Sequence, residues 1–275
     1  MSAVNHPASA ELEPFYIGPA ATQLFACYHP PQGEAHPLGF VLCPPHGQES
    51  IQFHRSLRLL ARLLSEAGFP VLRFDFRGCG DSMGDHEDWS LENWAQDVER
   101  ALQALEEKSG VSSLGLVGIR LGASVALAAA AARGGIEALV AWDTLLDGGE
   151  FLAEARAQHQ NMLAHAHVRV DMDPEGGPRS ELLGFPLPMA LAQDLESMAP
   201  AELQSCPARH ALVLESFARF PQAGLRQRLQ ELGTDTALQS HENPHLWAWT
   251  EDFARVHIPR KILEAIRHWA RELPS

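Results

Sequence analysis

The sequence predicts an α/β fold with a mostly parallel sheet and helices on both of its faces. The first observation is the alternation, along most of the chain, of short strand-like runs with stretches of helical periodicity. The second is the near-continuous apolar run LGFVLC at 38–43, which is typical of a strand covered on both faces. The third is the length of 275 residues, enough for one large domain whose core needs no metal or disulfide.

Each predicted strand is a short run bounded by turn residues or by a helix. In chain order the predicted strands are an opening hairpin of 14–18 and 24–29, then 38–43, 71–76, 114–118, 137–142, 210–216 and 236–241. Apolar residues at helical spacing predict a first helix that ends at Gly68 and Pro70: they are Leu57, Leu60, Ala61 and Leu64. Further helices are predicted at 91–105, 122–132, 221–232 and 259–272.

The alternation stops between about 148 and 206. This stretch begins with the helix-like GEFLAEARAQHQNMLAHA, continues through the loop-forming DMDPEGGPRS and ends in LLGFPLPMALAQDLESM. We therefore expect a mainly helical lid at 148–206 over the carboxyl edge of the sheet. It would be inserted into a core made of 1–147 and 207–275.

Composition limits the classes of function. The chain has 21 basic and 35 acidic residues and a formal net charge of −14, which argues against binding to nucleic acid or to an anionic membrane. No apolar run approaches the roughly 20 residues that span a bilayer, and no secretory signal is visible. The four cysteines are scattered without a CxxC pair, so a reducing compartment is the simpler assumption. We expect a cytoplasmic protein without membrane insertion, metal or cofactor.

Chemistry is expected where the strands of a parallel sheet end. The segments that follow predicted strands are CPPHGQES (43–50), DFRGCGDSMGD (75–85), GIRLGAS (118–124), DTLLDG (143–148), ESFARF (215–220) and SHENPHLW (240–247). Together they resemble the α/β-hydrolase superfamily over about residues 13–272. The combination of PPHGQE, DFRGCGDS, GIRLG and ELLGFPL more narrowly resembles the exosortase A system-associated hydrolases, accessory proteins of bacterial exopolysaccharide and protein-sorting loci.

The resemblance places a nucleophile elbow in GIRLGAS, where Gly118 and Gly122 are the small residues that the tight turn needs. The nucleophile position holds Arg120, whose protonated guanidinium has no lone pair for attack. Ser124 is an alternative in a shifted frame, although one turn inside the helix it more readily bonds a backbone carbonyl. Cys79 is a second alternative and would need a lowered thiol pKa. The residues with implied oxyanion-hole or pocket roles are His46, Gly47, Gln48 and Leu121.

The other two positions of a catalytic triad have more than one candidate. Asp143 follows the sixth strand, where many members of the family carry the acid, and Glu215 is an alternative. His245 lies in the loop before the last helix, where the family's histidine is found, and His241 is its rival. In the same segment, Trp247 is expected to pack rather than to bind.

Arg120 allows two interpretations of the site. At the N-terminus of a helix, beside free N–H groups, its guanidinium would suit a carboxylate or phosphate ligand. Alternatively, it forms an ion pair within the protein, with Glu49, Asp143 or Asp147 as the partner.

Two functions from different classes follow. The resemblance implies hydrolysis of an ester, thioester or related acyl bond, in which His245 or His46 activates water and Asp143 orients the histidine. The arginine at the elbow instead favours a catalytically inactive member of the family. Such a protein would bind an anionic ligand or a protein partner through Arg120. The expected ligand is therefore a small acyl or anionic molecule.

Overall fold

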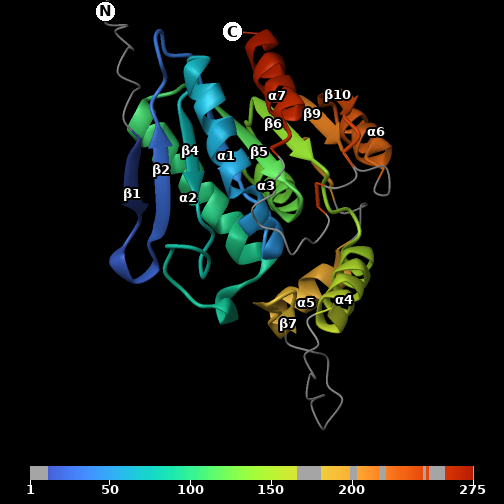
Figure 1. Ribbon diagram of the computed structural model, residues 1–275. Helices are drawn as coiled ribbons and strands as arrows, with labels where there is room; N and C mark the ends of the chain where they lie inside the picture. The colour runs from blue at the N-terminus through green and yellow to red at the C-terminus, as the bar shows by residue number, and fades with distance from the viewer. Residues whose placement is uncertain are drawn as a thin grey trace, which may run out of the picture.

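A mostly parallel sheet organises the fold (Figure 1). The computed structural model describes residues 12–165, 181–198, 203–216, 221–243, 246–247 and 258–274. In this part of the chain, eight strands form one sheet in the order β1-β2-β4-β3-β5-β6-β9-β10. Their bounds are β1 Glu13–Ile17, β2 Leu24–His29, β3 Leu38–Cys43, β4 Val71–Phe74, β5 Ser113–Ile119, β6 Ala138–Trp142, β9 His210–Glu215 and β10 Asp235–Ser240. β2 is antiparallel to both of its neighbours and all other pairs are parallel, which confirms the predicted fold class.

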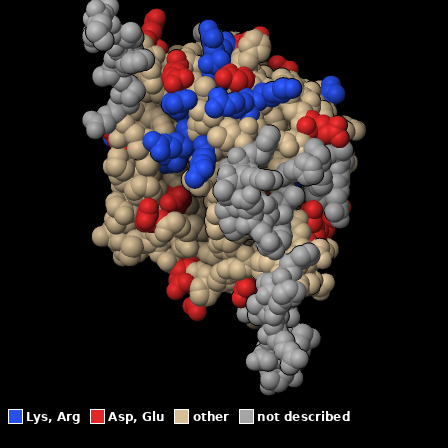
Figure 2. Space-filling model, viewed as in Figure 1, with Lys and Arg blue, Asp and Glu red and all other residues tan. Residues whose placement is uncertain are grey.

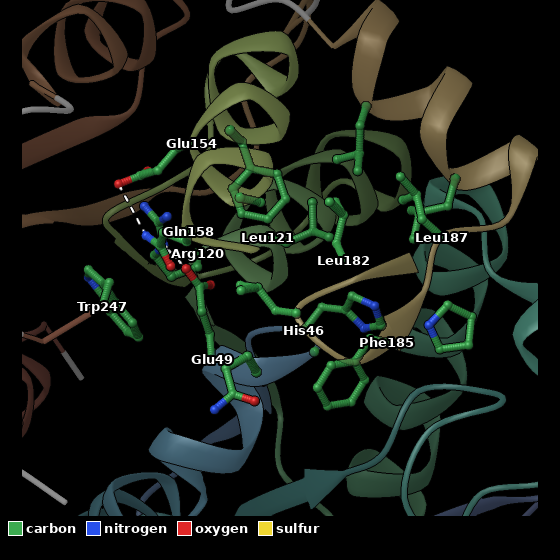
Figure 3. A pocket seen from close by; sticks show the side chains of 18 of the residues that line it. His46, Glu49, Arg120, Leu121, Glu154, Gln158, Leu182, Phe185, Leu187 and Trp247 are labelled. Carbon is green, nitrogen blue, oxygen red and sulfur yellow. Dashed lines mark hydrogen bonds and ion pairs between the residues drawn. The ribbon is translucent and has the colours of Figure 1, made fainter. Parts of the chain in front are cut away.

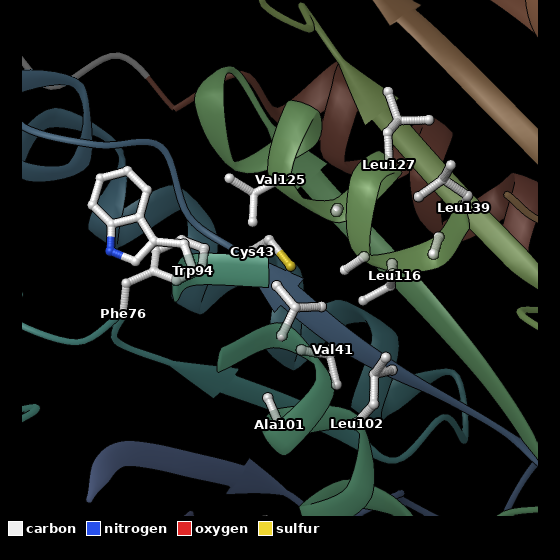
Figure 4. Close-up of a cluster of buried hydrophobic side chains, with 14 of the residues drawn as sticks. Val41, Cys43, Phe76, Trp94, Ala101, Leu102, Leu116, Val125, Leu127 and Leu139 are labelled. Atoms are coloured by element: carbon white, nitrogen blue, oxygen red, sulfur yellow. The ribbon is translucent and has the colours of Figure 1, made fainter. Parts of the chain in front are cut away.

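Helices cover both faces of this sheet. One layer consists of α1 (Gln48–Glu66) and α7 (Arg260–Glu272), and the other of α2 (Leu91–Ser109), α3 (Leu121–Arg133) and α6 (Ala223–Glu231). Alternate residues of a strand enter different layers: in β3, Val41 packs in the core that contains α2 and α3 (Figure 4), whereas Phe40 and Leu42 pack in the core that contains α1 and α7. This division explains why the run at 38–43 is apolar at nearly every position.

A smaller group of elements follows β6, at the lower right of Figure 1. It contains α4 (Gly148–His165), the hairpin of β7 (Glu181–Leu182) and β8 (Phe185–Pro186), and α5 (Met189–Ser197), which packs against α4. α4 begins where the carboxylate of Asp147 accepts a hydrogen bond from the backbone N–H of Glu150 at 2.8 Å. These elements fall within the predicted lid. Its limits at 148 and 206 stay a prediction, because 166–180 and 199–202 lie outside the described residues.

The predicted and observed strands differ mainly at their ends. The strand predicted at 71–76 ends at Phe74. Beyond it, the carboxylate of Asp75 accepts from the backbone N–H of Asp81 at 3.1 Å, and its carbonyl accepts from the hydroxyl of Ser82 at 2.6 Å. These bonds fold the chain into a loop instead of extending the strand.

The surface charge is uneven. Figure 2 shows Lys and Arg side chains gathered over α1 and α7. The exposed basic residues of these two helices include Arg55, Arg58, Arg62, Arg260, Lys261 and Arg271. The net charge of −14 therefore describes the whole chain and not this face. No helix in the described part of the chain is both long and apolar enough to cross a membrane.

Two glycines shape the turn between β5 and α3. A Cβ added at Gly122 would lie 2.2 Å from the carbonyl oxygen of Pro44, and one added at Gly118 would lie 2.4 Å from the Cα of Ala123. Both neighbours are backbone atoms, so rotation of a side chain cannot relieve either contact. The turn therefore requires glycine at both positions.

We expect Gly122→Ala to lower the free energy of unfolding by about 1–3 kcal/mol, because the added methyl group overpacks this turn. Denaturant titration measures the change. Gly224→Ala in α6 is the matched control, since no atom lies within 4 Å of its added Cβ. That variant should keep its stability or gain up to about 1 kcal/mol. Equal losses in the two variants would contradict the steric account.

Candidate functional site

The turn after β5 places Arg120 at the N-terminus of α3. Its backbone has φ 55° and ψ −124°, a positive φ that is unfavourable for a residue with a side chain. Its N–H donates to the carbonyl of Trp142 at 2.9 Å, and its carbonyl accepts from the N–H of Ala123 at 2.9 Å. This sharp strand–turn–helix geometry is the one that the motif resemblance predicts for GIRLG, and the side chain at the turn is a guanidinium.

The charge of Arg120 is already paired inside the protein. The side chain is 2% exposed, and its Nε donates to Oε1 of Glu49 at 2.9 Å. Its guanidinium carbon lies 5.5 Å from the ring centre of Trp247 and 6.0 Å from that of Phe151, within range of a cation–π contact. Of the two interpretations of Arg120, the geometry matches the internal ion pair.

Asp143 lies fully buried after β6, and its carboxylate accepts hydrogen bonds from three donors. Oδ1 accepts from the backbone N–H of Ser216 at 2.7 Å. Oδ2 accepts from the hydroxyl of Ser216 and from the indole N–H of Trp247, the latter at 2.7 Å. Because Trp247 also lies beside Arg120, the three side chains form the series Asp143–Trp247–Arg120.

This series has the order of a catalytic triad, in which an acid holds a histidine beside the nucleophile. Here Trp247 donates to the carboxylate that the motif resemblance predicts as the acid, and Arg120 lies where that resemblance predicts the nucleophile. An indole has one N–H donor and no second nitrogen that could accept a proton. Trp247 donates its indole N–H to Asp143 and presents its ring to Arg120, 5.5 Å from the guanidinium carbon, so this arrangement provides no chain of acid–base groups.

The described histidines do not supply the missing base at Asp143. His241 lies at the end of β10, where its Nε2 is 3.2 Å from Oε1 of Gln239. His46 contacts other aromatic rings instead of a carboxylate. His245, the first candidate, lies outside the described residues. No histidine in the described ranges donates to Asp143.

The remaining candidates have other contacts. The hydroxyl of Ser124 donates to the carbonyl of Leu145 at 2.7 Å, as expected for a serine inside a helix. Burial raises the pKa of the Cys79 thiol to about 12, so this thiol stays protonated at neutral pH. Glu215 accepts from the backbone N–H of Gln222 at 2.8 Å, just before α6.

A cavity of about 150 Å³ lies in front of Arg120. The predicted pocket residues His46, Gly47, Gln48 and Leu121 all line it. Side chains of α4, of the β7–β8 hairpin and of α5 form other parts of its wall (Figure 3). The structure thus brings together the loop after β3, the elbow and the elements of the predicted lid.

His46 lines this cavity as an uncharged ring. Its centre lies 4.6 Å from that of Trp89, 4.9 Å from that of Trp94 and 6.4 Å from that of Phe185. Burial lowers the pKa of His46 to about 4, so the imidazole is neutral at pH 7. A general base works best with a pKa near the operating pH, which makes His46 a poor activator of water.

The described lining of the cavity carries a net negative charge. It contains one cation, Arg120, and two carboxylates, Glu49 and Glu154, which gives 1 − 2 = −1 (Figure 3). Burial raises the pKa of the Glu49 carboxyl, and Arg120 offsets part of that rise. An anion at Arg120 would have to compete with Glu49, which argues against an anion receptor. The described residues contain no group of three His, Cys, Asp or Glu side chains that could hold a metal ion.

Comparison with known proteins supports the reading of the fold. Residues 40–274 match the model of the alpha/beta hydrolase family. Est1E from Butyrivibrio proteoclasticus, solved with bound ferulic acid, is similar with a TM-score of 0.64 at 19% identity, over 94% of this chain and 98% of that chain. An α/β serine hydrolase without a lid from Xanthomonas campestris has a TM-score of 0.59 at 18% identity, over 97% of both chains.

A hypothetical protein from Pseudomonas aeruginosa has a TM-score of 0.64 at 16% identity, over 97% of this chain and 95% of that chain. At these identities the likeness shows the fold alone. No curated protein matches the chain.

Proposed function

This chain belongs to the alpha/beta hydrolase family, and from that premise we propose that it binds a small molecule in the family's pocket without cleaving it. A cavity with mostly apolar walls and a few polar groups is typical of a small-molecule site. Its volume of about 150 Å³ suits a group of about the size of one benzene ring.

The observation that carries the proposal is the series Asp143–Trp247–Arg120. Covalent hydrolysis needs a nucleophile at the elbow and a base that takes its proton. Arg120 has no lone pair for attack, and Trp247 holds the hydrogen bond to Asp143 that a catalytic histidine would hold. An arginine in place of the nucleophile and a tryptophan in place of the histidine would each abolish covalent hydrolysis. The cavity beside the two residues is still present.

The narrower motif resemblance supports a cellular setting for this binding. PPHGQE, DFRGCGDS, GIRLG and ELLGFPL occur together in this chain, as in the exosortase A system-associated hydrolases. On that resemblance we propose that the protein is an accessory of an exopolysaccharide or protein-sorting system.

Chemical labelling and ester turnover test the proposal. The wild-type protein is treated with a fluorophosphonate ester probe, with an active serine hydrolase as the positive control, and analysed by intact mass. Hydrolysis of p-nitrophenyl acetate and butyrate is measured in parallel. We expect no adduct and no rate above the protein-free reaction. An adduct on Ser124 or Cys79, or ester turnover that His245→Ala abolishes, would establish the hydrolase alternative instead.

A further inference from the structure

We propose that the pocket selects an uncharged molecule with a compact apolar body and one hydroxyl or carbonyl oxygen, and that it discriminates against anions. The inference rests on the proposed function, because it takes the cavity in front of Arg120 to be a binding site. It goes further by assigning the chemical class of the ligand.

The first argument is charge. An anion that sought the guanidinium of Arg120 would compete with Glu49, whose Oε1 already lies 2.9 Å from Nε. It would also enter a lining that carries Glu154 as a second carboxylate. Displacing Glu49 would leave its carboxylate buried without a partner, which is strongly unfavourable. Because Arg120 is already paired with Glu49, its positive charge does not attract a further anion to this end of the cavity.

The second argument is unused hydrogen-bonding capacity. The side-chain nitrogens of Gln48 and Gln52 are buried and have no hydrogen-bond partner. The two residues lie four apart on α1, on the same face of the helix, and both line the cavity. An unpartnered buried donor is unfavourable, and an accepting oxygen of a ligand would relieve it.

His46 adds a second kind of polar group to the same cavity. No described residue hydrogen-bonds either of its ring nitrogens. In the neutral form the imidazole offers one donor and one acceptor. A hydroxyl group, which both donates and accepts, is complementary to the neutral imidazole and to the glutamine amides. A carboxylate can only accept, and Glu49 already pairs with the guanidinium that could balance its charge.

The third argument is the shape of the apolar part. Leu121, Leu182, Phe185 and Leu187 lie together on the side of the cavity away from Trp247 and Glu154 (Figure 3). Their side chains and the volume of about 150 Å³ leave room for one small ring. The ligand would place this ring among the apolar side chains and its oxygen near the first turn of α1.

A series of probes of similar size tests the proposal: toluene, benzyl alcohol and benzoate. Each is titrated into the full chain at neutral pH and followed by calorimetry. We expect benzyl alcohol to bind about threefold to tenfold tighter than toluene, the gain from one neutral hydrogen bond. We expect it to bind at least about tenfold tighter than benzoate, which would have to share or displace the partner of Arg120.

A substitution of Gln52 tests whether the oxygen of the ligand bonds the glutamine amides of α1. Gln52→Leu should reduce the preference for benzyl alcohol over toluene, measured as the ratio of the two affinities, by about threefold to tenfold. The variant removes an amide that has no partner, so we expect it to fold as the wild type does. Gln103→Leu is the matched control, because that amide lies on α2 and donates to Glu99 at 2.7 Å. It should change neither affinity.

The outcomes separate this inference from the proposed function. Tighter binding of benzoate than of benzyl alcohol would overturn the ligand class and leave the binding function intact. Equal binding of toluene and benzyl alcohol would overturn the role of the oxygen. If none of the three probes binds, both proposals fail. Turnover of benzyl acetate would overturn binding without cleavage and leave the preference for uncharged molecules standing.

Discussion

Arg120→Ser should lower the free energy of unfolding by about 3–5 kcal/mol, the cost of leaving one member of a buried ion pair without its partner. The side chain of Arg120 is 2% exposed and that of Glu49 is 15% exposed, so solvent screens the pair weakly. Removal of the guanidinium also takes away its contacts with the rings of Trp247 and Phe151. Urea unfolding of the variant and the wild type measures the difference.

Glu49→Gln separates the charge from the loss of packing. If the buried carboxylate causes the loss, Arg120→Ser should cost much less in a Glu49→Gln background than in the wild type. The two single losses then sum to more than the loss in the double variant, as expected for residues in direct contact. Strict additivity would contradict the ion-pair account.

The same carboxylate predicts a dependence on pH. Burial raises the pKa of Glu49 above its ordinary value of 4.5, and Arg120 lowers it. Without Arg120 the folded-state pKa rises further above the unfolded one. A group with a raised folded-state pKa contributes stability that is present below its unfolded pKa and lost as pH rises through its folded pKa. The deficit of Arg120→Ser should therefore grow as the pH rises above the folded-state pKa that Glu49 has in the wild type, which lies above 4.5, toward neutrality, and Glu49→Gln should abolish this trend.

The layers of the fold could be predicted because they depend on local patterns. The run at 38–43 is apolar on both faces, and the structure divides it between two helix layers. The end of β4 could not be predicted from such a pattern. It depends on hydrogen bonds that Asp75 accepts from residues 81 and 82. The apolar pattern of residues 71–76 gives no information about these bonds.

The candidate site was predictable where a motif is contiguous. GIRLG was enough to place Arg120 in the turn between β5 and α3. Its partner could not be chosen, because Glu49 is 71 residues away and meets it only through the packing of α1. The bond between Trp247 and Asp143 joins residues 104 apart and was missed. Its one signal was that Trp247 lies two residues after His245, in the segment assigned to the catalytic histidine.

Combining Arg120→Ser with Trp247→His should create ester hydrolysis that neither substitution creates alone. The carboxylate of Asp143 already accepts an N–H from residue 247 at 2.7 Å. An imidazole at that position would offer one nitrogen to Asp143 and the other to the serine introduced at position 120, as in a triad. Gly118 and Gly122 keep the turn that presents this serine. Base catalysis contributes about 10²–10⁴-fold, so we expect at least a hundredfold gain over Arg120→Ser alone.

All variants in this experiment carry Glu49→Gln, so that the buried carboxylate does not destabilise them. The matched control combines Arg120→Ser with Trp247→Phe, which keeps an aromatic ring but offers Asp143 no nitrogen. Initial rates with p-nitrophenyl acetate give the gain, and fluorophosphonate labelling followed by peptide mass spectrometry locates the nucleophile. A folded Trp247→His combination that is no faster than this control would show that Trp247 does not occupy the position of a triad histidine. Labelling at Ser124 would show that the hydroxyl inside α3 is the reactive group.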